Sequence, residues 1–182
     1  MDEIACQSLL AQAQQGDDRA FEALIEPLLE PSFRLACGML LDRAAAEDAV
    51  QEATFKAWRA LGRVRPDTTS LRGWFFTIVA NQCRSMRRSP WWSVLRGVGG
   101  GHAGDVSAES LVSTQVDLAS ALRLLDPRSR AAVVLRYYLD LSFEEVALVV
   151  GGSPDAAKSR IHRALRAMRV QLENQELEHA RA

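Results

Sequence analysis

The apolar residues of this chain recur with the period of an α-helix along most of its length. Asp17 or Asp18 can cap a helix, and an apolar stripe follows them in the sequence. Counted from its first residue, the other members of the stripe lie three, four and seven positions further along. Its members are Phe21, Leu24, Ile25 and Leu28. Pro27 and Pro31 lack an amide hydrogen, so we expect them to interrupt or kink this helix, which resumes over 33–41. No segment alternates apolar and polar residues for long enough to predict a strand, and the pattern indicates an all-α fold.

Two more helices are predicted in the first half of the chain, over 44–61 and 71–88. The first combines apolar and polar positions, namely Val50, Phe55, Trp58 and Leu61 with Glu47, Asp48, Gln51 and Glu52. A loop over 62–70, which contains Pro66, separates the two helices. The second helix is aromatic in its first half and basic in its second. At helical spacing with Ile78, Trp74 and Phe75 are more typical of core residues than of a binding surface.

A change in composition divides the chain into two parts. Residues 89–114 contain five glycines and several serines, which is typical of a flexible linker. The triple glycine at 99–101 is not a phosphate-binding loop, because no Lys-Ser/Thr follows it. We therefore expect two helical domains, over 1–90 and 115–175, joined by a linker over 91–114. Trp91 and Trp92 either pack on the first domain or contact a partner.

The second domain shows the start and stop signals of a helix-turn-helix. After a helix over 116–125, Asp126-Pro127 supplies a capping residue and a proline at the first helical position. The apolar face of that helix is Ala131, Val134, Leu135 and Tyr138. Ser142 and Glu145 fit a capping box, Gly151-Gly152 ends the helix, and Ser153-Pro154 begins the next. A helix, a tight glycine turn and a basic helix are the pattern of a major-groove reader.

The last helix separates an apolar face from a basic one. Ile161, Leu165, Met168 and Leu172 form the apolar face. The candidate DNA contacts near its N-terminal end are Ser153, Lys158, Ser159, Arg160, His162 and Arg163. An arginine there can bond a guanine edge with two hydrogen bonds, and the helix N-terminus can hold a phosphate. The alternative is an amphipathic surface helix with a charged outer face.

Charge is strongly segregated although the net charge is only −1. Residues 1–62 hold 11 acidic against 5 basic side chains, whereas 63–98 hold 7 arginines against one aspartate. Residues 128–170 hold 8 basic against 4 acidic side chains. Phosphates suit the two basic blocks, because neutralising each phosphate releases counterions. The distribution indicates two kinds of partner surface.

The cysteines and histidines of the chain show no pattern of a catalytic or metal site. Cys6, Cys37 and Cys83 are far apart, which favours reduced thiols over a metal or redox site. The three histidines (His102, His162 and His179) lack the partners of a metal site or a catalytic triad. These features argue against an enzyme and predict no cofactor. The N-terminus has neither the basic start nor the apolar core of a signal peptide. No apolar run is long enough to span a membrane. We therefore expect a cytoplasmic protein without membrane insertion.

Together, these segments resemble the extracytoplasmic-function (ECF) sigma factors of bacterial RNA polymerase. The segments EDAVQEATFKAWRAL (47–61) and LRGWFFTIVANQCRSMRR (71–88) resemble the N-terminal domain of that family. Its promoter-binding domain resembles LDPRSRAAVVLRYYLDLSFEEVALVVGGSPDAAKSRIHRALRAMR (125–169). The resemblance covers nearly the whole chain outside the linker and the two ends. Two blocks in the family's order are far more specific than a lone helix-turn-helix.

The resemblance implies partners and roles for particular residues. Core RNA polymerase would be bound at the clamp helices of its largest subunit by Asp48, Gln51, Glu52 and Phe55. The minus-ten element would be recognised and melted by Trp74, Asn81, Arg84, Arg87 and Arg88. The basic C-terminal helix would read the minus-35 element, and an anti-sigma protein is the family's usual inhibitor. For Phe55, the residues alone favour a core position beneath a solvated polar face.

The chain departs from the family pattern at two places. Ser85 stands where many relatives have an aspartate that supports the arginines of the helix. Asp155-Ala156-Ala157 stands where many have Gly-Thr-Val, which removes a threonine contact to phosphate at Ala156. The promoter sequence therefore does not follow from the family. A stand-alone helix-turn-helix regulator with an N-terminal dimerisation or sensor module remains the alternative function.

Overall fold

The computed structural model describes residues 3–64, 70–89 and 120–179, and within these ranges it contains helices and no strand. The all-α prediction is confirmed. The first half contains α1 (Glu3–Gln14), α2 (Asp18–Leu40), α3 (Arg43–Ala60), a short 3-10 turn (Leu61–Arg63) and α4 (Leu71–Arg88). The second half contains α7 (Pro127–Val133), the π-helical turn η2 (Val134–Tyr138), α8 (Phe143–Val150) and α9 (Pro154–His179). Residues 120–124 are also helical.

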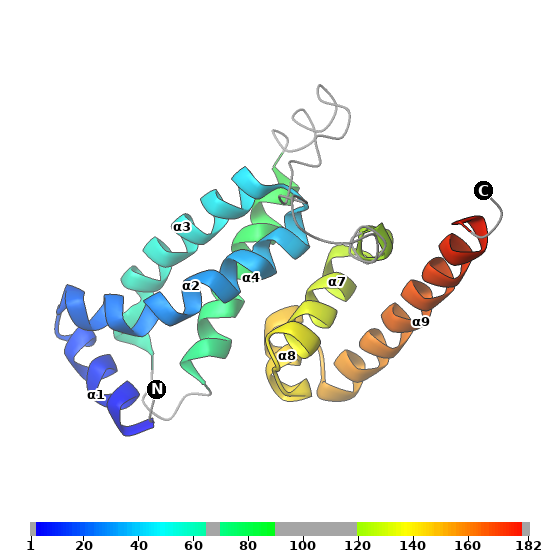
Figure 1. The fold of residues 1–182 in the computed structure, drawn as a ribbon. Coiled ribbons are helices and arrows are strands. Elements are labelled where there is room, and N and C mark those ends of the chain that lie inside the picture. Colours follow the sequence, from blue (N-terminus) through cyan, green and yellow to red (C-terminus); the bar gives the residue numbers. More distant parts are fainter. Residues whose placement is uncertain (1–2, 65–69, 90–119, 180–182) are drawn as a thin grey trace.

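In the first half, α2, α3 and α4 pack along one another, and α1 lies across the start of α2 (Figure 1). The buried face of α3 consists mainly of small residues, namely Ala46, Ala49, Val50, Ala53 and Ala57. Small side chains let the neighbouring helices approach closely, and the large core residues come from α2 and α4. Phe75 and Phe76 of α4 and Leu24 and Leu35 of α2 are fully buried. The prediction that Phe75 is a core residue is confirmed.

The expected interruption of α2 at its prolines is wrong. The helix runs without a break from Asp18 to Leu40 and contains both Pro27 and Pro31. Because the prolines are four residues apart, the two missing amide hydrogens lie on the same side of the helix. The buried face of α2, which includes Leu24, Ile25 and Leu35, is centred to one side of the prolines, and Pro27 is exposed. Packing of that face therefore outweighs the lost hydrogen bonds.

The second half is organised by the helix caps that the sequence predicts. The Asp126 carboxylate accepts hydrogen bonds from the amides of Arg128 and Ser129, and Pro127 occupies the first turn of α7. Ser142 and Glu145 form a complete capping box at the start of α8. Ser153 Oγ accepts from the Ala156 amide at 3.2 Å and caps α9. Gly151 and Gly152 have φ values of 85° and 114°, which only glycine adopts without strain. The helix-turn-helix is α8, this turn and α9.

One helical face differs from the prediction. Ala131 and Leu135 are buried as expected, but Tyr138 is 54% exposed. Val134–Tyr138 forms a π-helical turn, in which each hydrogen bond spans one more residue than in an α-helix. The wider turn rotates the following residues off the buried stripe. The Arg34 guanidinium instead lies over the Tyr138 ring, 4.7 Å from its centroid.

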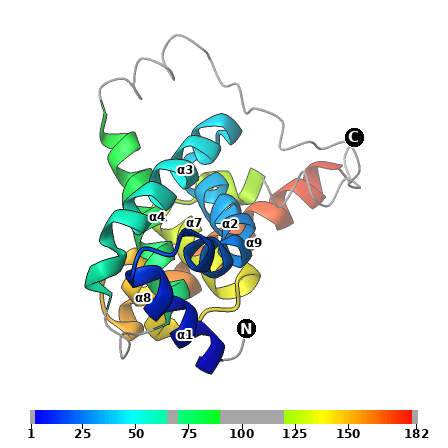
Figure 2. The ribbon, with the colours of Figure 1, turned by 90° about the vertical axis from the view of Figure 1, so that its left-hand side faces the viewer.

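The two halves pack against each other. One continuous hydrophobic core includes residues of α1 to α4 together with residues of α7, α8 and the start of α9. Helix α4 contacts α8, and α2 contacts α7 and η2. Figure 2 shows α7 and α8 lying behind α2 and α4 in the turned view. A smaller cluster, which includes Ala121, Leu125, Ala164 and Met168, holds residues 120–125 against α9.

Several expectations lie outside the described residues. These are the linker over 91–114 with Trp91 and Trp92, most of the loop around Pro66, and the first part of the helix over 116–125. Within the described residues, no helix combines the length and the apolar character required to cross a bilayer.

Candidate functional site

The four residues assigned to polymerase docking lie together on the solvent side of α3. Asp48, Gln51, Glu52 and Phe55 are all exposed, and Phe55 exposes 56% of its surface. Phe55 lies two positions from both Ala53 and Ala57, which is about 200° around the helix from that buried row. The core position favoured for Phe55 by the residues alone is therefore wrong. Position and exposure make these four side chains, which we call the α3 strip, available to a partner.

The α3 strip forms one side of a groove of about 1350 Å³. Aromatic and aliphatic side chains line its apolar part, namely Phe21, Leu29, Phe33, Val50, Phe55 and Trp58. Phe21 and Trp58 meet edge to face with ring centroids 5.0 Å apart. The groove therefore offers rigid aromatic surfaces beside the polar strip, which is the composition of a protein-binding site.

The groove is acidic. Its charged lining residues are all carboxylates, namely Asp18, Glu30, Glu47, Asp48 and Glu52. Glu30, Glu47 and Glu52 pair with basic residues one helical turn away on the same helix, and all three pairs are exposed. Exposed pairs of this kind contribute little energy, so a partner's cations can replace them at low cost. The electrostatics favour a basic partner surface.

Helix α4 carries the candidate minus-ten residues in two different environments. Asn81 and Arg88 are exposed, whereas Trp74, Arg84 and Arg87 are partly buried. Trp74 packs against the main hydrophobic core. Arg87 Nη1 donates to the Met39 carbonyl oxygen at 3.1 Å. Asn81 and Arg88 are thus the members of this set most accessible to a nucleic acid in this conformation.

Arg84 is bound to the second half of the chain. Its Nη1 donates to Asn81 Oδ1 and its Nη2 donates to the Val149 carbonyl oxygen of α8. Burial lowers the pKa of Arg84, and the nearby Arg128 and Arg88 guanidinium groups lower it further. The structure therefore places this candidate phosphate contact at the surface between the two halves.

A small pocket of about 290 Å³ adjoins Asn81 between α3 and α4. It is lined by Lys56, Ala60, Ile78, Asn81, Gln82 and Ser85. Lys56 Nζ donates to Gln82 Oε1 at 2.5 Å across the two helices. A cation, two amides and a hydroxyl around an apolar wall can hydrogen-bond a polar planar group. Lys56 and Gln82 carry no signal of a shared site in the sequence, because only their placement on adjacent helices brings them together.

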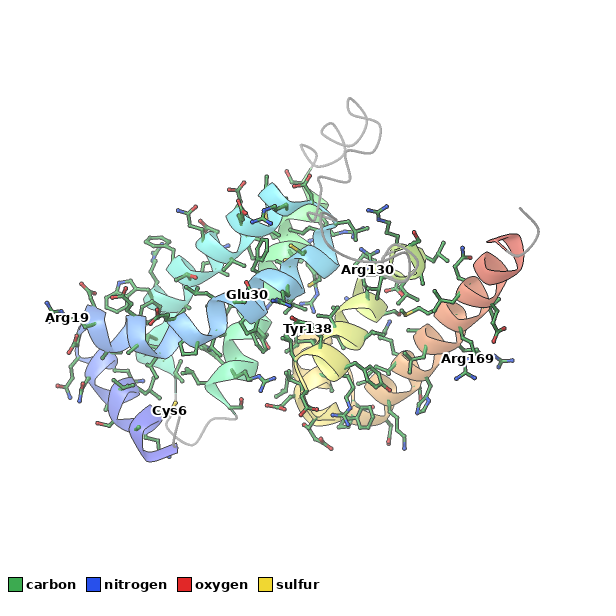
Figure 3. All side chains as sticks on the ribbon, in the orientation of Figure 1. Cys6, Arg19, Glu30, Arg130, Tyr138 and Arg169 are labelled. Carbon is green, nitrogen blue, oxygen red and sulfur yellow. The ribbon has the colours of Figure 1, made fainter. Side chains whose placement is uncertain are left out.

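The candidate minus-35 residues project from the first turns of α9. Ser153, Lys158, Ser159, His162 and Arg163 are exposed, and Arg160 is partly buried. The opposite face is buried through Ala157, Ile161, Ala164 and Met168. Arg166 and Arg169 continue the exposed basic face, and Figure 3 shows Arg169 pointing outward from α9. The predicted separation of an apolar and a basic face is present.

Arg160 differs from its neighbours because it lies near the cap of α7. Burial raises the pKa of Asp126, but the Ser129 hydroxyl, the Ser129 and Arg128 amides and the Arg160 charge lower it, and the net shift is downward. Arg163 Nε by contrast donates only to Ser159 O within its own helix, at 3.3 Å. Arg163 is therefore the freer of the two arginines to reach a base.

The sites hold no arrangement suited to a metal. Within the described residues, no three His, Cys, Asp or Glu side chains gather into a possible metal site. Cys6, Cys37 and Cys83 form no disulfide bond with one another. Burial raises the pKa of Cys37 to about 11 and that of Cys83 to about 12. These thiols are weak nucleophiles at neutral pH.

Comparisons with known proteins match two separate segments of the chain. Residues 24–93 match the family model of Sigma-70 region 2, and residues 115–168 match that of Sigma-70, region 4. The two matches together cover more than half of the chain. The first includes the α3 strip and α4, and the second includes the helix-turn-helix.

Relatives of known identity match along most of their length. The ECF RNA polymerase sigma factor SigL of Mycobacterium tuberculosis is 30% identical over 145 residues, covering 78% of this chain and 82% of SigL. The RNA polymerase sigma factor CarQ of Myxococcus xanthus is 36% identical over 171 residues, covering 92% of this chain and 98% of CarQ. Among solved structures, the sigma factor RpoE of Bartonella quintana, in complex with the anti-sigma factor NepR, has a TM-score of 0.70 and 26% identity. That match covers 84% of this chain and 96% of RpoE. The chain belongs to the ECF sigma factors of RNA polymerase.

Proposed function

We propose that this sigma factor binds core RNA polymerase through the domain at 1–90, directs it to particular promoters and helps to melt them. The domain at 115–175 would contact the minus-35 element. The chain would contribute no catalytic group and no cofactor, and the polymerase would supply the chemistry in the cytoplasm. The observation that carries this proposal is the exposure of Phe55 within an acidic, aromatic groove beside Asp48, Gln51 and Glu52.

The groove suits a helical, basic partner such as the clamp helices of the largest polymerase subunit. When a partner covers an aromatic side chain that is exposed in the free protein, the burial of its apolar surface stabilises the complex. Carboxylates around the anchor would attract lysine and arginine side chains and speed the encounter.

The two basic surfaces suit two different forms of DNA. The exposed face of α9 presents Lys158, His162 and Arg163 beside a helix N-terminus, which fits the major groove of a duplex. Asn81 and the pocket beside it fit an unstacked base of a melted strand, because amide groups can bond its exposed edge. Arg84, Arg87 and Arg88 would hold the adjacent phosphates. We propose these roles for the minus-35 and minus-ten contacts, respectively.

An anti-sigma protein is the further partner that we propose. The related sigma factor RpoE is bound to the anti-sigma factor NepR in its solved structure. The same fold over most of both chains supports an inhibitor of this kind here.

The docking proposal is tested by reversing one charge in the α3 strip. Asp48→Arg should weaken binding to purified core polymerase at least about tenfold, which is 1.4 kcal/mol, because a like charge would face a basic partner. Glu26→Arg is the matched control, since Glu26 is also an exposed helical carboxylate but does not line the groove. Affinity is measured by fluorescence anisotropy of the labelled sigma factor. Equal affinities for Asp48→Arg, Glu26→Arg and the unchanged chain would overturn the assignment of the strip.

A further inference from the structure

A side chain of α1 bonds the end of α3 across a long separation in sequence. Gln14 is the last residue of α1, and its side-chain Nε2 donates to the carbonyl oxygens of Leu61 at 3.1 Å and Val64 at 2.7 Å. A primary amide has two hydrogens, so both are used. The Leu61 residue begins the 3-10 turn at Leu61–Arg63, and Val64 follows it. Gln14 therefore fixes both ends of this turn.

Gln14 is itself held in a fixed place. Leu10 and Ala13 of α1 are buried in the main hydrophobic core, which also contains Leu61. After Gln14, the Gly16 amide donates to the Ala13 carbonyl oxygen at 3.0 Å, and Gly16 has a φ of 95°, which favours glycine. Figure 1 shows α1 beside the end of α3 that this turn continues, and α1 contacts the turn. The two hydrogen bonds of Gln14 thus join two packed elements and define the backbone position of residues 61–64.

The turn continues the face of α3 that lines the small pocket. Lys56 and Ala60 line this pocket beside Asn81 of α4. Arg63 follows Lys56 by seven positions and Ala60 by three, and residues at these spacings share one side of a helix. Arg63 is exposed. The spacing therefore places an exposed guanidinium at the rim of the pocket, on the turn that Gln14 holds.

Arg63 is the freer of the two cations on this face. Lys56 pairs with Glu52 at 3.6 Å and donates to Gln82. The Arg63 side chain forms no hydrogen bond, ion pair or ring contact with another residue that the structure describes. The donors of a free guanidinium suit a phosphate, which can accept two of them at once. A cation whose backbone is fixed in advance also loses less freedom when it binds.

We propose that Arg63 contacts a backbone phosphate of the melted minus-ten strand, and that Gln14 is the positioning residue that holds Arg63 beside the pocket. A base that enters the pocket between α3 and α4 brings its own backbone to the rim, where a cation stabilises the strand. Helix α1 thereby takes part in DNA binding without touching the nucleic acid. This inference rests on the proposed role of α4 and the pocket in holding an unstacked base.

The phosphate contact is tested by the salt dependence of DNA binding. The probe is a promoter fragment that the holoenzyme selects from a random library, prepared with a single-stranded minus-ten region. Arg63→Ala should weaken holoenzyme binding and reduce the slope of log affinity against log salt concentration by about 0.7, the value for one phosphate of a single strand. Arg19→Ala is the matched control, because Arg19 is an exposed arginine of α2 that lines neither the groove nor the pocket. An unchanged slope for Arg63→Ala would overturn the contact.

The positioning role of Gln14 is tested by a double-mutant cycle with Arg63. Gln14→Met keeps the length of the side chain but removes both donors, and it should weaken binding of the same probe about threefold. In that background Arg63→Ala should cost less than it does in the wild type, because a displaced guanidinium has less to lose. Gln14→Lys, whose ammonium can donate to the same two oxygens, should restore both the affinity and the full effect of Arg63→Ala. Additive effects of Gln14→Met and Arg63→Ala would refute the positioning role.

Two further measurements separate positioning from stability. Gln14→Met should leave the affinity for core polymerase unchanged, since the α3 strip lies elsewhere on α3, whereas general destabilisation would lower both affinities. Gln12→Met is the matched control, because the Gln12 amide bonds only to Ser8 Oγ within α1, at 3.4 Å. If Gln14→Met does not fold, Gln14→Ala, which leaves room for water at the two oxygens, takes its place in the cycle. A holoenzyme that assembles but selects no fragment would refute the proposed function itself, and this inference with it.

Discussion

Asp126 shows how a single side chain sets the start of a domain. One of its oxygens accepts from the Arg128 and Ser129 amides, and the other accepts from the Ser129 hydroxyl at 2.5 Å. These donors favour the charged carboxylate and lower its pKa although burial opposes them. The resulting stability is therefore present above the pKa of the unfolded chain, and it is lost as the pH falls through the lower folded-state value.

Replacement of Asp126 separates capping from charge. Asp126→Ala should lower the free energy of unfolding by about 1 kcal/mol at neutral pH, because the amides of the first turn lose their acceptor. Asp126→Asn retains an acceptor but does not titrate, so it should reduce the loss of stability on acidification. Urea unfolding at several pH values measures both effects. An alanine variant as stable as the wild type at every pH would contradict the importance of the cap.

The cysteines give a second prediction at this scale. Because burial raises the pKa of Cys83 to about 12 and that of Cys37 to about 11, both remain protonated thiols at pH 8. Iodoacetamide should therefore alkylate them far more slowly in the folded chain than in urea, with Cys83 the slower of the two. Mass spectrometry of timed reactions measures the rates. Rapid alkylation of Cys83 in the native protein would show that α4 is not buried as described.

At the scale of the element, the sequence predicted where helices start and end better than it predicted which of their faces are buried. The bounds of 71–88 and the caps at Asp126, Ser142 and Ser153 are confirmed, because capping depends on residues a few positions apart. The continuity of α2 was missed because its buried face outweighs two prolines. The residues alone also missed the outward position of Phe55, which the family resemblance implied. The row of alanines in α3 contained the signal, because small residues occupy its inward face.

The recognition helix gives the prediction that belongs to this scale. Arg163 is exposed and bonds only within α9, whereas Arg160 lies near Asp126. Arg163→Ala should therefore weaken promoter binding by about 1–3 kcal/mol and relax specificity at one minus-35 position. Arg169→Ala, at the far end of the same exposed face, should weaken binding slightly and equally for all sequences. Competition binding of the holoenzyme to promoter variants distinguishes the two, and equal behaviour would contradict a base contact by Arg163.

At the scale of the whole molecule, the acidic and basic segments of the sequence correspond to different surfaces of the structure. The acidic excess of residues 1–62 includes the carboxylates of the groove, and the basic blocks include α4 and α9. The packing of the two domains on each other did not follow from the sequence. Arg84 of α4 donates to the Val149 carbonyl oxygen of α8, and Arg130 of α7 donates to the Gly38 carbonyl oxygen of α2. Neither arginine belongs to a periodic pattern. Two guanidinium groups that meet carbonyls far along the chain leave no local signal.

The family assignment and the two basic surfaces support the same conclusion: this chain enables RNA polymerase to start transcription at particular promoters. The direct measurement is in vitro transcription with purified core polymerase and a library of promoter fragments, followed by sequencing of the transcript 5′ ends. We predict defined start sites that require the chain and that Asp48→Arg strongly reduces. Transcripts that start at the same sites and levels without the chain, or no transcripts from a holoenzyme that does assemble, would contradict the account.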